Sequence, residues 1–227
     1  MVRAVLLDAM GTLLELDPPA PRLRHELRER ANVELTLAEA GSAMAAEIGF
    51  YRAHHQAGRD RASLAGLRRE CAVALRDALP GSAGELPLDV VGGAMLAAIH
   101  FRVYPEAISV LERLRGAGVH RVVVSNWDVS LHEVLQEVGL APLLSGTITS
   151  AELGASKPSP AIFRHALTLA GVPARDAVMV GDSVLEDVDG ARAVGVTPVL
   201  VARDGAVPEV DGVRVIRSLR ELPKLVA

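Results

Sequence analysis

The sequence predicts a doubly wound parallel α/β sheet with an α-helical domain inserted after the first strand. Short runs of Val, Leu and Ile recur along the chain, and most are followed by a helical pattern. One long stretch, between the first two runs, has helical patterns throughout. Strands that alternate with helices form parallel sheets, and such strands are near-continuously apolar because helices bury both faces of the sheet.

Five apolar runs are expected to be strands: RAVLLDA (3–9), RVVVSNW (121–127), TITSA (147–151), AVMVGDS (177–183) and TPVLVAR (197–203). A helix is expected at 130–139, starting in a capping box formed by Ser130 and Glu133. Another is expected after Ser159, with Pro160 at its first position. Each of these two helices should end at a glycine.

The inserted segment is rich in Ala, Leu, Glu and Arg, which favour helices. Four stretches suit helices: 21–31, 36–57, 62–79 and 88–99. Asp17-Pro18-Pro19 and Tyr104-Pro105 are expected to be the two hinges. The predicted domains are therefore an α/β core of residues 1–16 and 101–227 and a helical cap of residues 17–100.

Composition narrows the class of protein. The chain has 227 residues, half of them apolar, with a net charge of −4 and 3% aromatic residues, so nucleic acid is not an expected partner. The apolar runs are too short for a membrane span, and the N-terminus has no signal-peptide pattern. The one cysteine, Cys71, is expected to be a buried small residue. These features predict a cytoplasmic protein whose partner is a small molecule.

Polar residues stand at or just beyond the ends of the predicted strands. In open parallel sheets, ligands bind outside the carboxyl ends of the strands. Lys157 lies in the loop GASKPSP and is one of two lysines in the chain, so a chemical role is favoured over a solvated surface position. The other polar residues of this edge are Asp8, Ser125-Asn126, Asp182 and Asp187.

Phosphoryl transfer would use this set of residues. The Asp8 carboxylate can attack phosphorus or an alkyl carbon as a covalent nucleophile. Mg²⁺ prefers carboxylate and carbonyl oxygens, which Asp8 and Asp182 could supply. Ser125, the amides near Asn126 and the Lys157 ammonium would bind the transferring oxygens.

The pattern is similar to that of the haloacid dehalogenase superfamily, in order and in spacing, over essentially the whole chain. Its motifs are Asp8…Gly11-Thr12, Ser125-Asn126, Lys157-Pro158 and Gly181-Asp182-Ser183…Asp187, and the stretches SKPSPAIF and GDSVLEDVDGARAVG are the most specific. The resemblance implies a Rossmann-like core with a helical cap and a bound Mg²⁺. It also implies a role for each motif residue: Asp8 as nucleophile and metal ligand, Thr12 and Ser125 as phosphate ligands, Lys157 as neutralising cation, Asp182 as metal ligand, and Asp187 as support for the metal or for Lys157.

Met10 departs from the pattern. Phosphatases of the superfamily have a second aspartate there, which protonates the leaving group and then activates water. The main-chain carbonyl of Met10 can still bind Mg²⁺, but losing a general acid typically costs about 10²–10⁴ in rate. The favoured prediction is a Mg²⁺-dependent phosphohydrolase of a small phosphorylated metabolite, with altered or weak activity.

Two alternatives remain from the sequence. A 2-haloacid dehalogenase also lacks the second aspartate, but it is metal-free, and this chain has acidic Asp182 and has Phe163 where a tyrosine is expected. A catalytically silent protein that binds a phosphorylated ligand is the other alternative. The phosphonate-cleaving members need a cap lysine, and residues 17–100 contain none. A histidine of the cap (His25, His54 or His55) is a hypothetical substitute for the missing acid.

Overall fold

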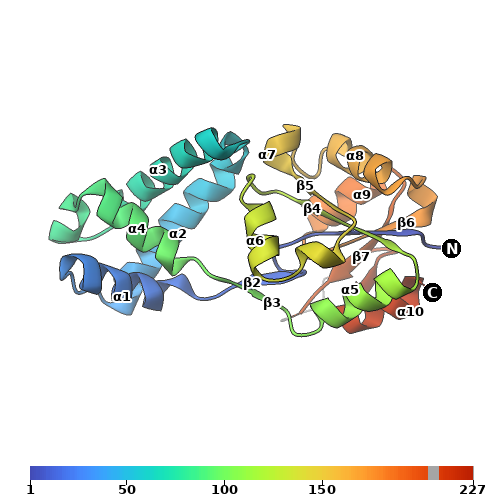
Figure 1. Cartoon of the computed structure of the whole chain (residues 1–227), viewed down its shortest axis with the longest axis horizontal. Coiled ribbons are helices and arrows are strands. Elements are labelled where there is room, and N and C mark those ends of the chain that lie inside the picture. The colour runs from blue at the N-terminus through green and yellow to red at the C-terminus, as the bar shows by residue number, and fades with distance from the viewer. Residues whose placement is uncertain (204–209, 227) are drawn as a thin grey trace. The chain divides into compact units, whose positions relative to one another are not determined.

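The computed structural model describes residues 1–203 and 210–226. The chain forms two compact units, one of Met1–Glu15 with Val103–Ala227 and the other of Leu16–Arg102. The first unit holds a parallel sheet with helices on it, and the second is helical (Figure 1). Within the described ranges, no helix combines the length and the apolar character needed to cross a membrane.

The predicted parallel sheet is confirmed. Six described strands pair in the order β5-β4-β1-β6-β7-β8, and every pairing is parallel. Their bounds are β1 Ala4–Leu7, β4 His120–Ser125, β5 Gly146–Thr149, β6 Ala177–Gly181, β7 Thr197–Val201 and β8 Arg214–Ile216. All five predicted strands end two residues earlier than predicted, because the residues that follow them belong to loops or, after β5, to helix α7. The short strand β8 was not predicted.

Helices cover both faces of the sheet, which explains why its strands are apolar throughout. Phe163 of α8 packs in one core with alternate residues of the sheet, including Leu6 and Val124. Figure 1 shows α8 and α9 on one side of the strands and α5 and α10 on the other. The helices of this unit are α5 Ala107–Gly116, α6 Leu131–Glu137, α7 Ser150–Leu153, α8 Pro160–Ala170, α9 Gly190–Arg192 and α10 Leu222–Val226, and a π-helical turn spans Val184–Asp189.

One of the two predicted helix starts is correct. The Ser159 hydroxyl caps α8 by accepting a hydrogen bond from the Ala161 N–H, and α8 ends at Gly171 in the left-handed conformation. The predicted capping box at Ser130 is wrong. The backbone of Ser130 is already helical, so its side chain makes no capping bond, and its N–H instead donates to Oδ1 of Asp128 at 2.6 Å.

The second unit contains helices where they were predicted. They are α1 Pro19–Ala31, α2 Leu37–His54, α3 Arg61–Asp77 and α4 Leu88–Ala98. Capping boxes of Thr36 with Glu39 and of Asp60 with Ser63 start α2 and α3. Their apolar faces share a core that includes Leu27, Leu75, Met95 and Cys71, so Cys71 is buried as expected.

The chain passes between the units twice, within two short strands that were not predicted. β2 (Leu14–Leu16) and β3 (Phe101–Val103) have three residues each and pair with each other. The Asp17 N–H donates to the His100 carbonyl at 2.9 Å, which extends this pairing into the helical unit.

Candidate active site

The topology brings three strand ends together. β1 lies between β4 and β6, and Leu7 is in register with Val123 and Val180. Asp8 follows β1 directly, and its N–H donates to the Val180 carbonyl at 2.9 Å. Side chains that follow these three strands therefore meet at one edge of the sheet, as the sequence predicted.

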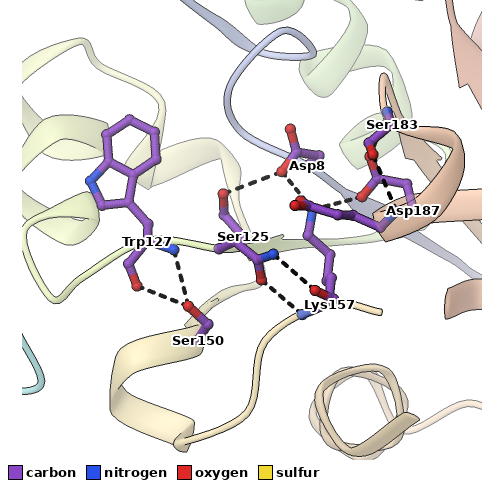
Figure 2. Close-up of polar contacts among 9 residues, drawn as sticks. Asp8, Ser125, Trp127, Ser150, Lys157, Ser183 and Asp187 are labelled. Atoms are coloured by element: carbon purple, nitrogen blue, oxygen red, sulfur yellow. Dashed lines mark hydrogen bonds and ion pairs between the residues drawn. The ribbon is translucent and has the colours of Figure 1, made fainter. Parts of the chain in front are cut away.

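Lys157 joins two of the predicted carboxylates. Its Nζ donates to Oδ1 of Asp8 at 2.7 Å and to Oδ1 of Asp187 at 2.6 Å (Figure 2). The Ser125 hydroxyl donates to the same Asp8 oxygen at 3.2 Å. All four side chains are buried, and that of Lys157 is 1% exposed. The structure thus brings together Asp8, Ser125, Lys157 and Asp187.

Asn126 positions the lysine loop. Its side-chain nitrogen donates to the Lys157 carbonyl at 3.0 Å, and its side-chain oxygen accepts from the Lys157 N–H at 2.8 Å. The side-chain amide therefore bonds both polar groups of the Lys157 main chain. A phosphate contact by Asn126 or by the amides near it stays a prediction. The Ser150 hydroxyl bonds the main chain of Trp127, in the loop that follows β4, a contact the sequence analysis missed (Figure 2).

Asp187 is held on both of its oxygens. While Oδ1 accepts from Lys157, Oδ2 accepts from the Ser183 N–H at 3.0 Å (Figure 2). A Cβ on Gly181 would lie 2.1 Å from the Asp187 carboxyl carbon, so only glycine fits there. The Gly181-Asp182-Ser183 motif therefore also serves to seat Asp187, a role that sequence analysis did not assign to Ser183.

The third carboxylate, Asp182, lies next to the turn that follows β1. Asp8, Asp182 and Asp187 each present an oxygen within 4.8 Å of the others. Gly11 has a φ of +78°, and a Cβ there would lie 2.1 Å from Oδ2 of Asp182. Three carboxylates so close together repel one another, and a hard divalent cation such as Mg²⁺ would relieve that repulsion. The donor set fits the predicted metal.

Burial and charge set the protonation of this cluster. Burial raises the pKa of Asp8 above its usual range, Lys157 opposes this shift, and the other two carboxylates add to it. Burial by itself would lower the pKa of Lys157, but Asp8 and Asp187 raise it, so the lysine stays charged. Partial desolvation and repulsion from Asp187 raise the pKa of Asp182.

The turn after Asp8 contains Met10 and Thr12. The Gly11 N–H donates to the Leu14 carbonyl at 2.7 Å, and Met10 bridges to Leu14. The thioether of Met10 supplies no proton. Thr12 is fully buried, and among the described side chains its Oγ1 is the one buried polar atom without a hydrogen-bond partner. A buried hydroxyl with a free donor is what a phosphate oxygen would satisfy.

The remaining candidates lie outside this cluster. Phe163 is fully buried in the core under the sheet and packs close to Gly190. In the helical unit, the ring of His54 stacks on that of Phe50 with 4.1 Å between centroids. His55 follows at the end of α2, near the ring of Tyr51. A catalytic role for the histidines of the helical unit stays a prediction.

Known proteins match this chain along most of its length. A family model described as "Hydrolase: haloacid dehalogenase-like hydrolase" matches residues 2–195. The phosphoserine phosphatase of Thermus thermophilus is 33% identical over 230 residues, covering 92% of this chain and 91% of that protein. The chain matches other curated relatives over about half of their length: the haloacid dehalogenase-like hydrolase domain-containing protein 3 of Danio rerio is 35% identical over 127 residues, which cover 55% of this chain and 52% of that protein.

Solved structures of a phosphatase and of a dehalogenase share the fold of this chain. The HAD phosphatase from Thermococcus onnurineus has a TM-score of 0.68 and 27% identity, covering 99% of this chain and 98% of that one. The 2-haloacid dehalogenase from Pseudomonas syringae has a TM-score of 0.70 and 25% identity, covering 100% and 98%. Overall similarity therefore does not separate the two reactions, and the site residues must decide between them.

Proposed function

Because the chain belongs to the haloacid dehalogenase-like hydrolase family, we propose that it is a Mg²⁺-dependent phosphohydrolase acting on a small phosphorylated metabolite. The observation that carries the proposal is the acidic edge of the sheet. The Asp8 carboxylate is held by Lys157 and Ser125, and an oxygen of Asp182 lies within 4.8 Å of an Asp8 oxygen. The relationship to a phosphoserine phosphatase over most of both chains supports the same class.

In the proposed reaction, a carboxylate oxygen of Asp8 attacks the phosphorus and the bond to the ester oxygen breaks, which leaves an aspartyl-phosphate. Lys157 and Ser125 hold Asp8 in place, and the lysine ammonium offsets the charge of the phosphate. Thr12 offers its unpartnered hydroxyl to a phosphate oxygen. Water then attacks the phosphorus and releases Asp8.

The metal would be held by the carboxylates of Asp8 and Asp182 and by the main-chain carbonyl of Met10. When bound, Mg²⁺ supplies positive charge that screens the attacking carboxylate from the phosphate. Asp187 would support Lys157, whose ammonium it binds at 2.6 Å, or the metal, since one of its oxygens lies within 4.8 Å of those of Asp8 and Asp182.

Met10 lowers the proposed activity. The leaving oxygen receives no proton from this position, and no carboxylate there activates water for the second step. A loss of about 10²–10⁴ in rate is typical for a missing general acid or base. Substrates with good leaving groups should therefore react in the first step and stall in the second.

Single-turnover kinetics test the proposal. The protein is mixed with p-nitrophenyl phosphate and Mg²⁺, and released phenolate and the mass of the intact protein are followed together. We expect a phenolate burst and a phosphate adduct in the natural protein, no adduct in Asp8→Asn, and faster turnover in Met10→Asp. No burst and no adduct, with Met10→Asp equally inert, would rule the phosphatase out.

A dehalogenase is the second candidate, and Met10 is the observation that favours it, since a halide leaves without a proton. The acidic residue Asp182 opposes it. Halide release from a short 2-halo acid, measured in the presence of EDTA, distinguishes the two enzymes. Binding of Mg²⁺ and phosphate without turnover of either substrate would instead indicate a catalytically silent binding protein.

A further inference from the structure

Arg203, a mostly buried arginine outside the predicted set, contacts the turn that follows Asp8. It lies two residues beyond β7, and its side chain is 14% exposed. Its Nε donates to the Gly11 carbonyl at 3.1 Å, and its Nη2 donates to the Thr12 carbonyl at 2.6 Å. One guanidinium therefore holds two successive main-chain carbonyls of the turn between β1 and β2.

The guanidinium is itself fixed on its other side. Its Nη1 donates to Oε1 of Glu106 at 2.7 Å, and the same oxygen accepts from the Ser218 hydroxyl at 3.0 Å. Its carbon lies 3.4 Å from the centroid of the Tyr104 ring. A planar cation with a fork of donors, stacked on an aromatic face and paired with a carboxylate, has little freedom to move.

The turn that Arg203 holds has no spare room on the side of Asp182. Gly11 adopts a positive φ, and even a methyl group there would overlap the Asp182 carboxylate. Arg203 restrains the carbonyls of Gly11 and Thr12, while Asp182 packs against the Gly11 Cα. The turn is therefore held between a fixed cation and one of the acidic residues of the site.

We propose that Arg203 is a positioning residue of the active site, which acts through the carbonyls of Gly11 and Thr12 to set the spacing of Asp8, Thr12 and Asp182. The catalytic part of this inference rests on the proposed function, and the positioning part does not. A misplacement of about 1 Å in a catalytic group can cost about 10²-fold in rate. Loss of the guanidinium should therefore slow the first chemical step more than it weakens substrate binding.

Arg121 provides a matched control for Arg203. It is also buried, at 8% exposed, and it too donates to two main-chain carbonyls, those of Leu143 (2.6 Å from Nε) and Val119. It lies near the start of β4, whereas Ser125 ends that strand. Arg121→Met thus removes a comparable set of hydrogen bonds without touching the turn.

Two readouts are compared in Arg203→Met, Arg203→Lys and Arg121→Met. Hydrogen–deuterium exchange of a peptide covering residues 8–14 reports the turn directly, and single turnover of p-nitrophenyl phosphate with Mg²⁺ reports the chemistry. We expect Arg203→Met to exchange at least tenfold faster and to slow the burst about 10–100-fold, with half-saturation changed less than threefold. Arg203→Lys should give values between those of Arg203→Met and the natural protein. Arg121→Met should stay within twofold of the natural protein in both the exchange rate and the burst rate.

Normal protection and a normal burst in Arg203→Met would overturn the inference, as would equal losses in Arg121→Met. If the natural protein gives no burst and Met10→Asp is equally inert, the proposed function fails, and the exchange comparison alone decides whether Arg203 holds the turn. If Arg203→Met does not fold, Glu106→Gln takes its place, because it loosens the arginine without removing it. An unchanged exchange rate at residues 8–14 in that variant would count against the inference.

Discussion

Each unit of the protein buries a carboxyl group, and the two surroundings differ. In the α/β unit, Asp8 is 6% exposed and accepts a hydrogen bond from Lys157. In the helical unit, Glu47 is 3% exposed and is hydrogen-bonded to the thiol of Cys71. Burial raises the pKa of both groups, to about 7 in each case. A full charge opposes the shift at Asp8, and a neutral thiol opposes it at Glu47.

The difference shows what an active site requires of a buried acid. A carboxylate that must attack a substrate has to stay ionised away from water, so it needs a cation that is itself held ionised. Asp8 and Asp187 hold Lys157 in that state. In the helical core no such demand exists, and the carboxyl of Glu47 is buried beside the neutral thiol of Cys71. The two groups therefore differ in the charge of their partners and not in their pKa.

Removing the cation should have the largest effect. Lys157→Met leaves two buried carboxylates without their counter-ion, so we expect a loss of about 3–5 kcal/mol in the free energy of unfolding at pH 7.5, and no burst. Urea denaturation followed by circular dichroism measures the first quantity. The control is Lys224→Met, the other lysine, which is exposed on α10 and should change stability by less than about 0.5 kcal/mol. A loss below about 1 kcal/mol for Lys157→Met would contradict this account.

The pH dependence of stability tests the effect of burying Glu47 in the helical unit. The Glu47 carboxyl binds its proton more tightly in the folded protein, where its pKa is about 7, than in the unfolded chain, near 4.5. Its contribution to stability is therefore complete below pH 4.5 and lost as pH rises through 7, a change on the order of 3 kcal/mol.

Glu47→Gln cannot ionise, so its free energy of unfolding should fall less between pH 5 and pH 8 than that of the natural protein. Denaturation curves across this range measure the difference, with Glu29→Gln, at an exposed position, as the control. Parallel pH profiles for Glu47→Gln and the natural protein would show that Glu47 does not carry the effect.

The close packing of Gly11 against Asp182 predicts a smaller loss of stability. Gly11 and Gly139 have nearly the same positive φ, +78° and +77°, but a Cβ on Gly139 meets no described atom within 4 Å. We expect Gly139→Ala to cost about 1 kcal/mol from backbone strain. Gly11→Ala should cost about 1–2 kcal/mol more and weaken Mg²⁺ binding, because it displaces Asp182. Equal costs, measured by urea denaturation, would mean that Asp182 moves aside freely.

The smallest expected change in stability is that for replacing Thr12, and a second buried threonine, Thr149, serves as the comparison. Thr149 Oγ1 donates to the Glu152 side chain at 2.8 Å and accepts from the Glu152 N–H at 3.2 Å, whereas Thr12 Oγ1 has no described partner. Thr149→Val should cost about 1–2 kcal/mol, and Thr12→Val should change stability by less than about 0.5 kcal/mol. Thr12→Val should nevertheless weaken phosphate binding, measured by calorimetry with Mg²⁺ present. Unchanged phosphate affinity would leave the Thr12 hydroxyl without a function.

The sequence pointed to most of this cluster because strand ends in a parallel sheet meet at one edge. The rarity of lysine singled out Lys157, and the apolar run before Asp8 placed it at that edge. Helix starts were less certain, as Ser130 shows. A serine followed three residues later by a glutamate matches a capping box. In the structure, however, the Ser130 N–H donates to the carboxylate of Asp128.

The contacts of Arg203 and Asn126 could not be predicted from the residues next to them in the sequence. Arg203 stands 192 residues from the Gly11 carbonyl that it binds, and nothing in TPVLVAR distinguishes it from other arginines that end a strand. Asn126 matched a motif, but its contacts with the Lys157 main chain depend on how two loops lie against each other.

The sequence by itself determined the alternation of strands and helices, the inserted helical segment and the chemical types present at the sheet edge. Periodicity and turn residues act over a few neighbours, and that range is enough for these features. The tertiary structure alone decided which side chains touch: Lys157 between two carboxylates, Asp182 against Gly11, and Glu47 beside Cys71. Those contacts join residues far apart in the chain, such as Lys157 and Asp8, which are 149 positions apart, so packing and not local pattern sets their distances and their charges.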